Sequence, residues 1–132
     1  MRFLLDTHSF LWAVFEPEKL SRAARKMIED PANDVLVSVI TFWEISLKYN
    51  LGKIALEGVG PEELPRIAEE MALEILSVSP NEAATFHRLP RVAHRDPFDR
   101  LIIWQAIQHK MGLISKDRSF RGYQKYGLKV FW

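Results

Sequence analysis

Four carboxylates that lie far apart in the sequence are each expected at a strand end, at a helix start or on a helix that follows a strand: Asp6, Glu44, Asp99 and Asp117. Asp6 ends the apolar run 3–5, and Asp117 follows the segment 112–115. Such runs are typical of strands covered on both faces, and ligands of open parallel sheets bind beyond the carboxyl ends of the strands. Carboxylates that share such an edge repel one another unless a cation lies between them. The pattern therefore predicts a site for Mg²⁺ or Mn²⁺, which suit hard oxygen ligands.

Each of these acids also has an ordinary structural interpretation. Glu44 stands four residues before Lys48, a spacing typical of an ion pair on a helix surface. Its neighbour Leu47 is apolar, however, which favours a carboxylate that faces inward toward the sheet. Asp6 suits an Asx-turn, and Asp117 suits the N-cap of a short turn. No acid is specific alone, but their order and settings together favour the metal site.

The segment from His94 to Arg100 contains two acids with different expected roles. Asp96 is predicted mainly to cap a helix whose first position is Pro97. Asp99 falls at the third helical position, where a capping box carries Glu or Gln. It could serve the helix dipole alone, but its shorter side chain leaves it freer to bind a metal.

Other residues near these acids have the chemistry to assist them. Three hydroxyls beside the strand ends suit hydrogen bonds to ligands or to bound water: Thr7, Ser38 and Ser115. Basic residues flank two of the acids, and the nearest are predicted to contact substrate phosphates: Arg95, Arg100, Lys116 and Arg118. For any one of them a solvated surface position is the competing interpretation. The four histidines show no zinc-motif spacing and are expected to be structural or surface residues.

The elements that must position these residues alternate along the chain. Strands are predicted at 3–5, 35–39, 73–78, 112–115 and 129–132, and helices at 8–15, 22–29, 41–50, 61 onward, 80–90 and 98–110. The last helix is apolar on nearly every face and should therefore be buried. This alternation predicts an α/β fold: a central, mostly parallel sheet of about five strands with helices on both faces.

Composition narrows the class of protein. The 132 residues fit one domain, 1–132, and the 18 basic and 17 acidic residues nearly balance. Neutralising the acidic site would leave a basic excess that suits a polyanionic substrate. The absence of cysteine excludes disulfides and cysteine-based zinc or iron–sulfur sites. No signal peptide and no apolar stretch of membrane-spanning length is found, which predicts a soluble, cytoplasmic protein that does not enter a membrane.

Several stretches resemble the PIN-domain family, and specifically VapC-type toxins of bacterial and archaeal toxin–antitoxin pairs. They are residues 1–8, 43–45, 95–102 and 113–117, in the family's order and across essentially the whole chain. The resemblance implies a PIN-like three-layer α/β/α domain that cleaves RNA as an endoribonuclease and needs Mg²⁺ or Mn²⁺. Asp6, Glu44, Asp99 and Asp117 would be its catalytic and metal-binding acids. Ser115 stands where the family often has Thr, and Asp99 matches the third acid better than Asp96 does.

The implied reaction is hydrolysis of an RNA phosphodiester by a water molecule that the bound metal orients for in-line attack. Glu44 could be a ligand or could take the water's proton, and both roles stay open. The resemblance also implies an antitoxin that covers the site and a homodimer. The aromatic-rich segments 11–15 and 42–49 are candidate contact surfaces.

Two other functions compete with the ribonuclease. A catalytically silent PIN-like module that binds RNA or a protein is disfavoured because all four acids are present. A phosphatase of the haloacid-dehalogenase type would use Asp6 as nucleophile. That class needs an Asp-x-Asp pattern, whereas this chain has Asp6–Thr7–His8.

Overall fold

The strands form one parallel sheet in the computed structural model, which describes residues 1–92 and 94–132. Within these residues the sheet has five strands: β1 (Arg2–Leu5), β2 (Asp34–Ser38), β3 (Glu74–Leu76), β4 (Gly112–Ile114) and β5 (Lys129–Phe131). Their order is β3-β2-β1-β4-β5, and every pairing is parallel. The predicted sheet is thus confirmed, with strand bounds that differ by at most two residues.

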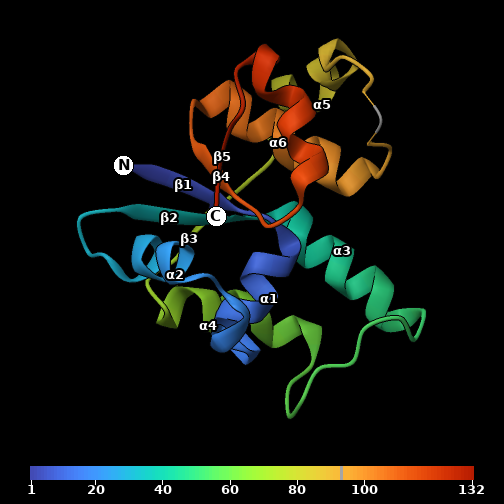
Figure 1. Cartoon of the computed structure of the whole chain (residues 1–132). Coiled ribbons are helices and arrows are strands. Elements are labelled where there is room, and N and C mark those ends of the chain that lie inside the picture. Colours follow the sequence, from blue (N-terminus) through green and yellow to red (C-terminus); the bar gives the residue numbers. More distant parts are fainter. Residues whose placement is uncertain (93) are drawn as a thin grey trace.

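Helices cover both faces of this sheet (Figure 1). The main helices are α1 (Thr7–Phe15), α2 (Arg22–Glu29), α3 (Val39–Asn50), α4 (Leu64–Glu70), α5 (Pro80–Thr85) and α6 (Pro97–His109). Shorter 3₁₀ segments are η1 (Pro17–Lys19), η2 (Pro61–Glu63), η3 (Phe86–Arg88) and η4 (Arg118–Tyr126). In the figure, α5, α6 and the red η4 lie on one side of the strands, and α1, α2 and α4 lie on the other.

The strands build an apolar core on each face because successive side chains point to opposite sides. One core joins the α6 side to the sheet residues Leu4, Leu36 and Leu113. The other joins the α1 side to Phe3, Leu5, Val37 and Ile114. Each such fully buried side chain contributes about 1.5–3 kcal/mol of hydrophobic stabilisation. Helix α6 is buried as predicted, with Ile102 and Ile103 inaccessible to solvent.

The strand order places a crevice beside the central strand. From β1 the chain builds outward through β2 to β3, and it then returns to place β4 and β5 on the other side of β1. Ligands of open α/β sheets bind where the order reverses in this way. At that point the backbone N–H of Asp6 donates to the carbonyl of Ile114 over 3.2 Å, so the two strand ends are joined.

Helix α3 begins earlier than predicted. Its N-cap is Ser38, whose Oγ accepts from the backbone N–H of Ile40 over 3.1 Å, so the helix starts at Val39 rather than at Thr41. The missed signal is the N-cap preference of a serine that directly follows a strand.

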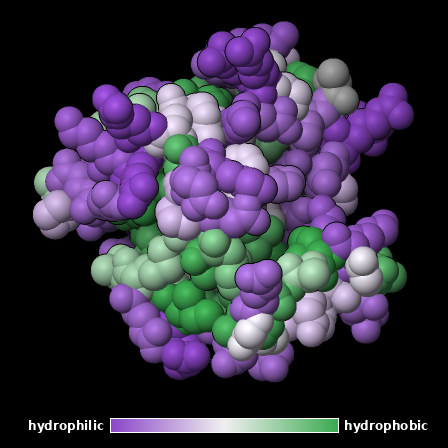
Figure 2. Space-filling model, turned by 60° about the horizontal axis from the view of Figure 1, so that its bottom comes forward, coloured by the Kyte–Doolittle hydropathy of each residue, from purple (hydrophilic) through white to green (hydrophobic). Residues whose placement is uncertain are grey.

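Polar side chains cover most of the surface in Figure 2, which also shows an apolar area on the side that carries α1. No helix among the described residues is long and apolar enough to span a membrane.

Candidate active site

Asp6 is buried at the junction of β1 and α1. It caps α1: Oδ1 accepts from the backbone N–H of Ser9 over 2.8 Å. Its other oxygen, Oδ2, accepts from the hydroxyl of Ser115 over 2.6 Å. Burial raises the pKa of Asp6, and the hydrogen bonds from Ser115 and Ser9 only partly oppose this effect. The carboxylate is therefore fixed in place, and its hydrogen bonds offset only part of the cost of burying its charge.

Glu44 faces inward from α3, and only 3% of it is exposed. Its Oε1 accepts from the hydroxyl of Thr7 over 2.6 Å, and Oε2 is paired with the ammonium group of Lys48. Both interpretations of Glu44 are thus partly right, since the ion pair exists but the carboxylate is buried. Desolvation lowers the pKa of Lys48, but the hydrogen bond and charge of Glu44 outweigh it, and the pKa is raised.

Asp99 lies in the first turn of α6, next to the residue that caps that helix. Asp96 is this cap, as predicted: its Oδ1 accepts from the backbone N–H groups of Phe98 and Asp99 over 2.9 and 3.2 Å. Burial, followed by the negative charges of Asp96 and Glu44, raises the pKa of Asp99 to about 6, against the opposing hydrogen bond with His94. Partial burial beside two other negative charges is the environment expected of a carboxylate that binds a cation.

Asp117 is exposed and caps η4. Its Oδ1 accepts from the backbone N–H of Ser119 over 2.9 Å and from the Ser119 hydroxyl over 2.7 Å. Partial burial works to raise the pKa of Asp117, but these hydrogen bonds outweigh it, and the pKa is lowered. The predicted N-cap is confirmed, and this carboxylate remains ionised to lower pH than an ordinary aspartate.

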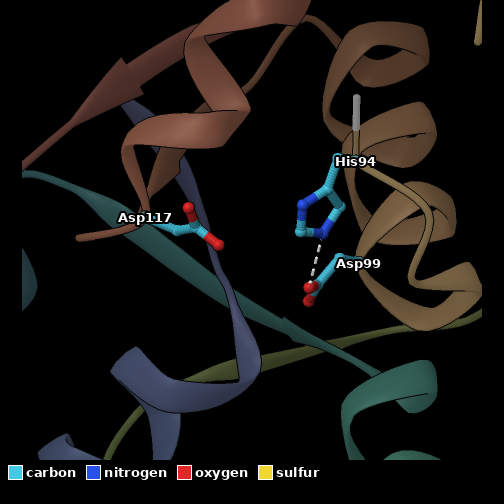
Figure 3. Close-up of side chains that lie close together, drawn as sticks. All are labelled: His94, Asp99 and Asp117. Carbon is cyan, nitrogen blue, oxygen red and sulfur yellow. Dashed lines mark hydrogen bonds and ion pairs between the residues drawn. The ribbon is translucent and has the colours of Figure 1, made fainter. Parts of the chain in front are cut away.

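His94 joins this group, although sequence alone indicates a structural or surface role. Its Nε2 lies 2.8 Å from Oδ2 of Asp99, and its Nδ1 lies 2.9 Å from Oγ of Ser119. Ligand atoms of His94, Asp99 and Asp117 all lie within 4.8 Å of one another (Figure 3). The only signal in the sequence is the position of His94 five residues before Asp99, in the loop that enters α6.

Ser115 links the two strand ends. Besides donating to Asp6, its Oγ accepts from the backbone N–H of Asp117 over 3.1 Å. Asp6 and Asp117 also line one cavity of about 260 Å³, together with His8, Trp12 and Lys116. Asp6 and Asp117 thus follow β1 and β4, and Glu44 lies on the helix after β2. Of the four predicted acids, Asp99 and Asp117 are the two that the described residues bring within 4.8 Å of each other, together with His94.

Two other predicted residues have partners elsewhere. Ser38 donates to Oε1 of Gln105 over 2.6 Å and caps α3, so its hydroxyl is directed to α6. Arg100 donates from Nη2 to the carbonyl of Leu89 over 3.0 Å and lies over the ring of Phe86. Its guanidinium is therefore engaged at the C-terminal end of η3.

The remaining predicted phosphate contacts are solvent-exposed: Arg95, Lys116 and Arg118. Lys116 lies beside the acids, with its Nζ 5.8 Å from the centre of the Trp12 ring, and it lines the same cavity as Asp6 and Asp117. Exposed cations beside a carboxylate cluster can contact the phosphates that flank a scissile bond.

Comparison with known proteins shows which family the sequence of this chain matches. Residues 3–126 match the family model described as PIN domain. Ribonuclease VapC22 of Mycobacterium tuberculosis is 35% identical over 121 residues, which cover 92% of this chain and 91% of the relative.

Solved structures share the fold over nearly the whole chain. VapBC2 from Rickettsia felis, bound to a DNA fragment from its promoter, has a TM-score of 0.68 at 16% identity and covers 99% of this chain and 98% of that one. VapBC-5 from Mycobacterium tuberculosis, a member of the VapBC family of toxin–antitoxin systems, has a TM-score of 0.60 at 19% identity, with coverages of 98% and 97%.

Proposed function

This chain belongs to the PIN domain family, and from that premise we propose that it is a metal-dependent endoribonuclease, the toxin of a toxin–antitoxin pair. The observation that carries the proposal is the grouping of Asp99 and Asp117 with His94, whose ligand atoms lie within 4.8 Å of one another, next to Asp6, which Ser115 connects to Asp117. Two of the four predicted acids, Asp6 and Glu44, are almost completely buried. Burying a carboxylate is costly, and a cation site nearby is the function that best accounts for two buried acids beside the exposed Asp117 and the partly buried Asp99.

The donor set fits Mg²⁺ or Mn²⁺. The carboxylates of Asp6, Glu44, Asp99 and Asp117 would hold the ion. Among the described residues, the ion pairs of these acids are limited to Glu44 with Lys48 and Asp99 with His94. When bound, such an ion polarises a phosphoryl oxygen and lowers the pKa of an attacking water.

Neighbouring donors hold two of the acids in fixed positions for hydrolysis. Ser9 and Ser115 fix the two oxygens of Asp6, and Thr7 and Lys48 fix those of Glu44. In hydrolysis, a water oxygen bonds to phosphorus while the bond to the leaving ribose oxygen breaks. The water's proton passes to a base, for which Glu44 is the candidate if it is not a ligand, and the leaving oxygen takes a proton from solvent.

RNA would approach over the exposed cations Arg95, Lys116 and Arg118. They lie on the two segments that carry Asp99 and Asp117, so a phosphate backbone that contacts them passes the acids. Contacts of this kind give binding that depends on salt more than on sequence.

An antitoxin is the proposed inhibitor, by analogy with the toxin–antitoxin complexes that share the fold. A groove of about 510 Å³ lies between α1 and residues 54–57, and its apolar lining includes Leu11, Trp12 and Phe15. His8 and Trp12 line both this groove and the cavity that contains Asp6 and Asp117. A partner segment in the groove, on the side seen in Figure 2, would therefore reach the acids.

A homodimer is proposed through α3. Its Trp43 is 59% exposed, and Leu47 and Tyr49 are exposed as well. Exposed aromatic side chains on one helix are enriched in interfaces between subunits. Light scattering that shows a monomer at high protein concentration would contradict the dimer.

The decisive experiment is RNA cleavage by the purified chain with Mg²⁺, Mn²⁺ or EDTA. It compares the parent with Asp6→Asn, Asp99→Asn and, as a matched control, Glu69→Gln, which changes an exposed acid on α4. We expect metal-dependent cleavage that both site variants lose and the control keeps. If calorimetry shows no metal binding by the parent, the ribonuclease fails and the silent binding module takes its place.

A further inference from the structure

The ring of His94 is fixed on several sides. Its two nitrogens have separate partners, Asp99 at Nε2 and Ser119 at Nδ1. Its edge packs on Phe120 with ring centres 5.0 Å apart and an interplanar angle of 84°. The hydroxyl of Tyr123 donates to the backbone carbonyl of His94 over 3.4 Å. A histidine held in this way presents Nε2 in one direction, toward Asp99 (Figure 3).

The Ser119 hydroxyl lies between the ring of His94 and the carboxylate of Asp117. The Ser119 hydroxyl has one proton and lies 2.7 Å from Oδ1 of Asp117, an oxygen that only accepts when it is ionised. When the Ser119 hydroxyl donates to Asp117, its oxygen is left to accept from an N–H at Nδ1 of His94. In the neutral ring the lone pair is then on Nε2, which faces the carboxylate of Asp99.

This arrangement is the one found in metal-binding histidines. Such residues donate from one ring nitrogen to an oxygen, which fixes the tautomer, and bind the ion through the other. A lone pair and a carboxylate oxygen 2.8 Å apart need a cation between them, either a proton or a metal ion. Neighbouring ligand atoms around an ion with bonds of 2.0–2.2 Å lie about 3 Å apart, which is close to the separation of His94 Nε2 and Asp99 Oδ2.

We propose that Nε2 of His94 is a metal ligand and that, with the carboxylates of Asp99 and Asp117, it gives the site a preference for a first-row transition-metal ion, Mn²⁺ over Mg²⁺. The proposal rests on the proposed function because it shares two acids with that site. An imidazole nitrogen suits transition-metal ions, whereas Mg²⁺ is served by oxygen ligands and water. His94 therefore contributes selectivity that the acids alone do not supply.

The first test measures Mn²⁺ and Mg²⁺ affinity by calorimetry in the full chain and in His94→Gln. The matched control is His109→Gln, because His109 also pairs through Nε2 with a buried carboxylate, that of Glu82, at the other end of α6. We expect His94→Gln to weaken Mn²⁺ binding by about tenfold or more and Mg²⁺ binding by much less. The control should change neither affinity. Equal weakening for both ions would overturn the proposal and leave His94 as a residue that only positions Asp99.

The second test needs no variant, so it holds even if His94→Gln folds poorly. Protein labelled with ¹⁵N in histidine is titrated with Zn²⁺, a diamagnetic probe. We expect the Nε2 resonance of His94 to shift on binding while Nδ1 keeps its proton and the His109 resonances stay unchanged. If Zn²⁺ binds and His94 Nε2 does not shift, the inference fails alone. If the parent binds no Mn²⁺, Mg²⁺ or Zn²⁺, the inference and the proposed metal-dependent nuclease fail together.

Discussion

Ser115 and Asp6 are joined by a hydrogen bond of 2.6 Å across the two central strands, although 109 positions separate them in the sequence. The same serine oxygen accepts from the backbone of Asp117. One hydroxyl therefore bonds to the carboxylate of the acid that follows β1 and to the backbone of the acid that follows β4. A side chain without the hydroxyl, such as alanine, would remove the hydrogen bonds to both acids.

Replacing Ser115 with Ala should weaken both the fold and metal binding. Asp6 would lose a donor inside the protein, which costs about 1.5–3 kcal/mol for a hydrogen bond to a charged group. The pKa of Asp6 would rise further, because the Ser115 hydrogen bond lowers it. Urea unfolding with EDTA measures the first effect and Mn²⁺ calorimetry the second. Ser115→Thr keeps the hydroxyl and should retain most of both; a Thr variant as impaired as Ala would refute this role.

Asp99→Asn should make the metal-free protein more stable at pH 8. Its carboxylate is partly buried near Asp96 and Glu44, and folding raises its pKa from 3.8 to about 6. The ionised form is therefore disfavoured by folding, by on the order of 1–3 kcal/mol above that pKa. Asn removes the charge, and its amide offers both a donor and an acceptor to Nε2 of His94. Chemical denaturation in EDTA measures the gain, and Mn²⁺ should stabilise the parent but not the variant. A less stable variant in EDTA would contradict the prediction.

Lys48→Met should destabilise the metal-free chain by about 1–2 kcal/mol, because Glu44 would keep a buried charge without its cation while Lys48 itself is partly exposed. Added Mn²⁺ should recover most of this loss, since a bound ion supplies the missing positive charge. Thermal unfolding with and without Mn²⁺ reports both quantities. Lys53→Met, at an exposed lysine in the loop after α3, is the control and should change neither. Failure of Mn²⁺ to restore stability would place Glu44 outside the metal site.

A pH-dependent contribution to stability is expected from Glu82, far from the acids. Burial works to raise its pKa, but hydrogen bonds from Gln105, His109 and the Ser79 backbone outweigh it, so the pKa lies below 4.5. A lowered folded-state pKa stabilises the protein above the unfolded value, and this stability is lost as pH falls through the folded-state value. Glu82→Gln should therefore unfold about 1–2 kcal/mol more easily at pH 6, with a gap that narrows below pH 4.5. A constant gap from pH 6 to pH 3 would show that the charge is irrelevant.

The cations near the site should separate into two groups. Lys116→Gln and Arg118→Gln should each weaken binding of single-stranded RNA and reduce the slope of log K against log salt by about one. Arg100→Gln should leave that slope unchanged and lower stability instead, because Arg100 is bonded to the carbonyl of Leu89. Fluorescence anisotropy in EDTA avoids cleavage during the measurement. A reduced slope for Arg100→Gln would contradict this division and support the predicted contact between Arg100 and a phosphate.

The sequence was informative where local chemistry determines the structure. Asp96 before Pro97 is a strong N-cap signal, and the structure has that cap. The runs 3–5 and 112–114 are short and contain no polar side chain, so the strands and the edge at which they end could be predicted from pattern alone.

Sequence was less informative where a side chain's direction depends on distant partners. Ser38 was expected beside the acids, but Gln105, which is 67 positions away, directs its hydroxyl toward α6. Arg100 has a carbonyl partner in the loop before α6, and no spacing rule predicts such a contact. His94 joins the site because η4, far along the chain, brings Ser119 and Phe120 to its ring.

The pairing of β1 with β4, two strands that lie far apart in the sequence, has a consequence for the timing of synthesis. β1 ends at residue 5, yet its neighbour β4 is formed by residues 112–114, and Asp117 is synthesised later still. A nascent chain that ends before this point has Asp6 without Ser115 and without the fourth acid. The proposed ribonuclease site therefore cannot assemble during translation until the chain extends through residue 117, and a shorter nascent chain has no complete site with which to cleave its own message.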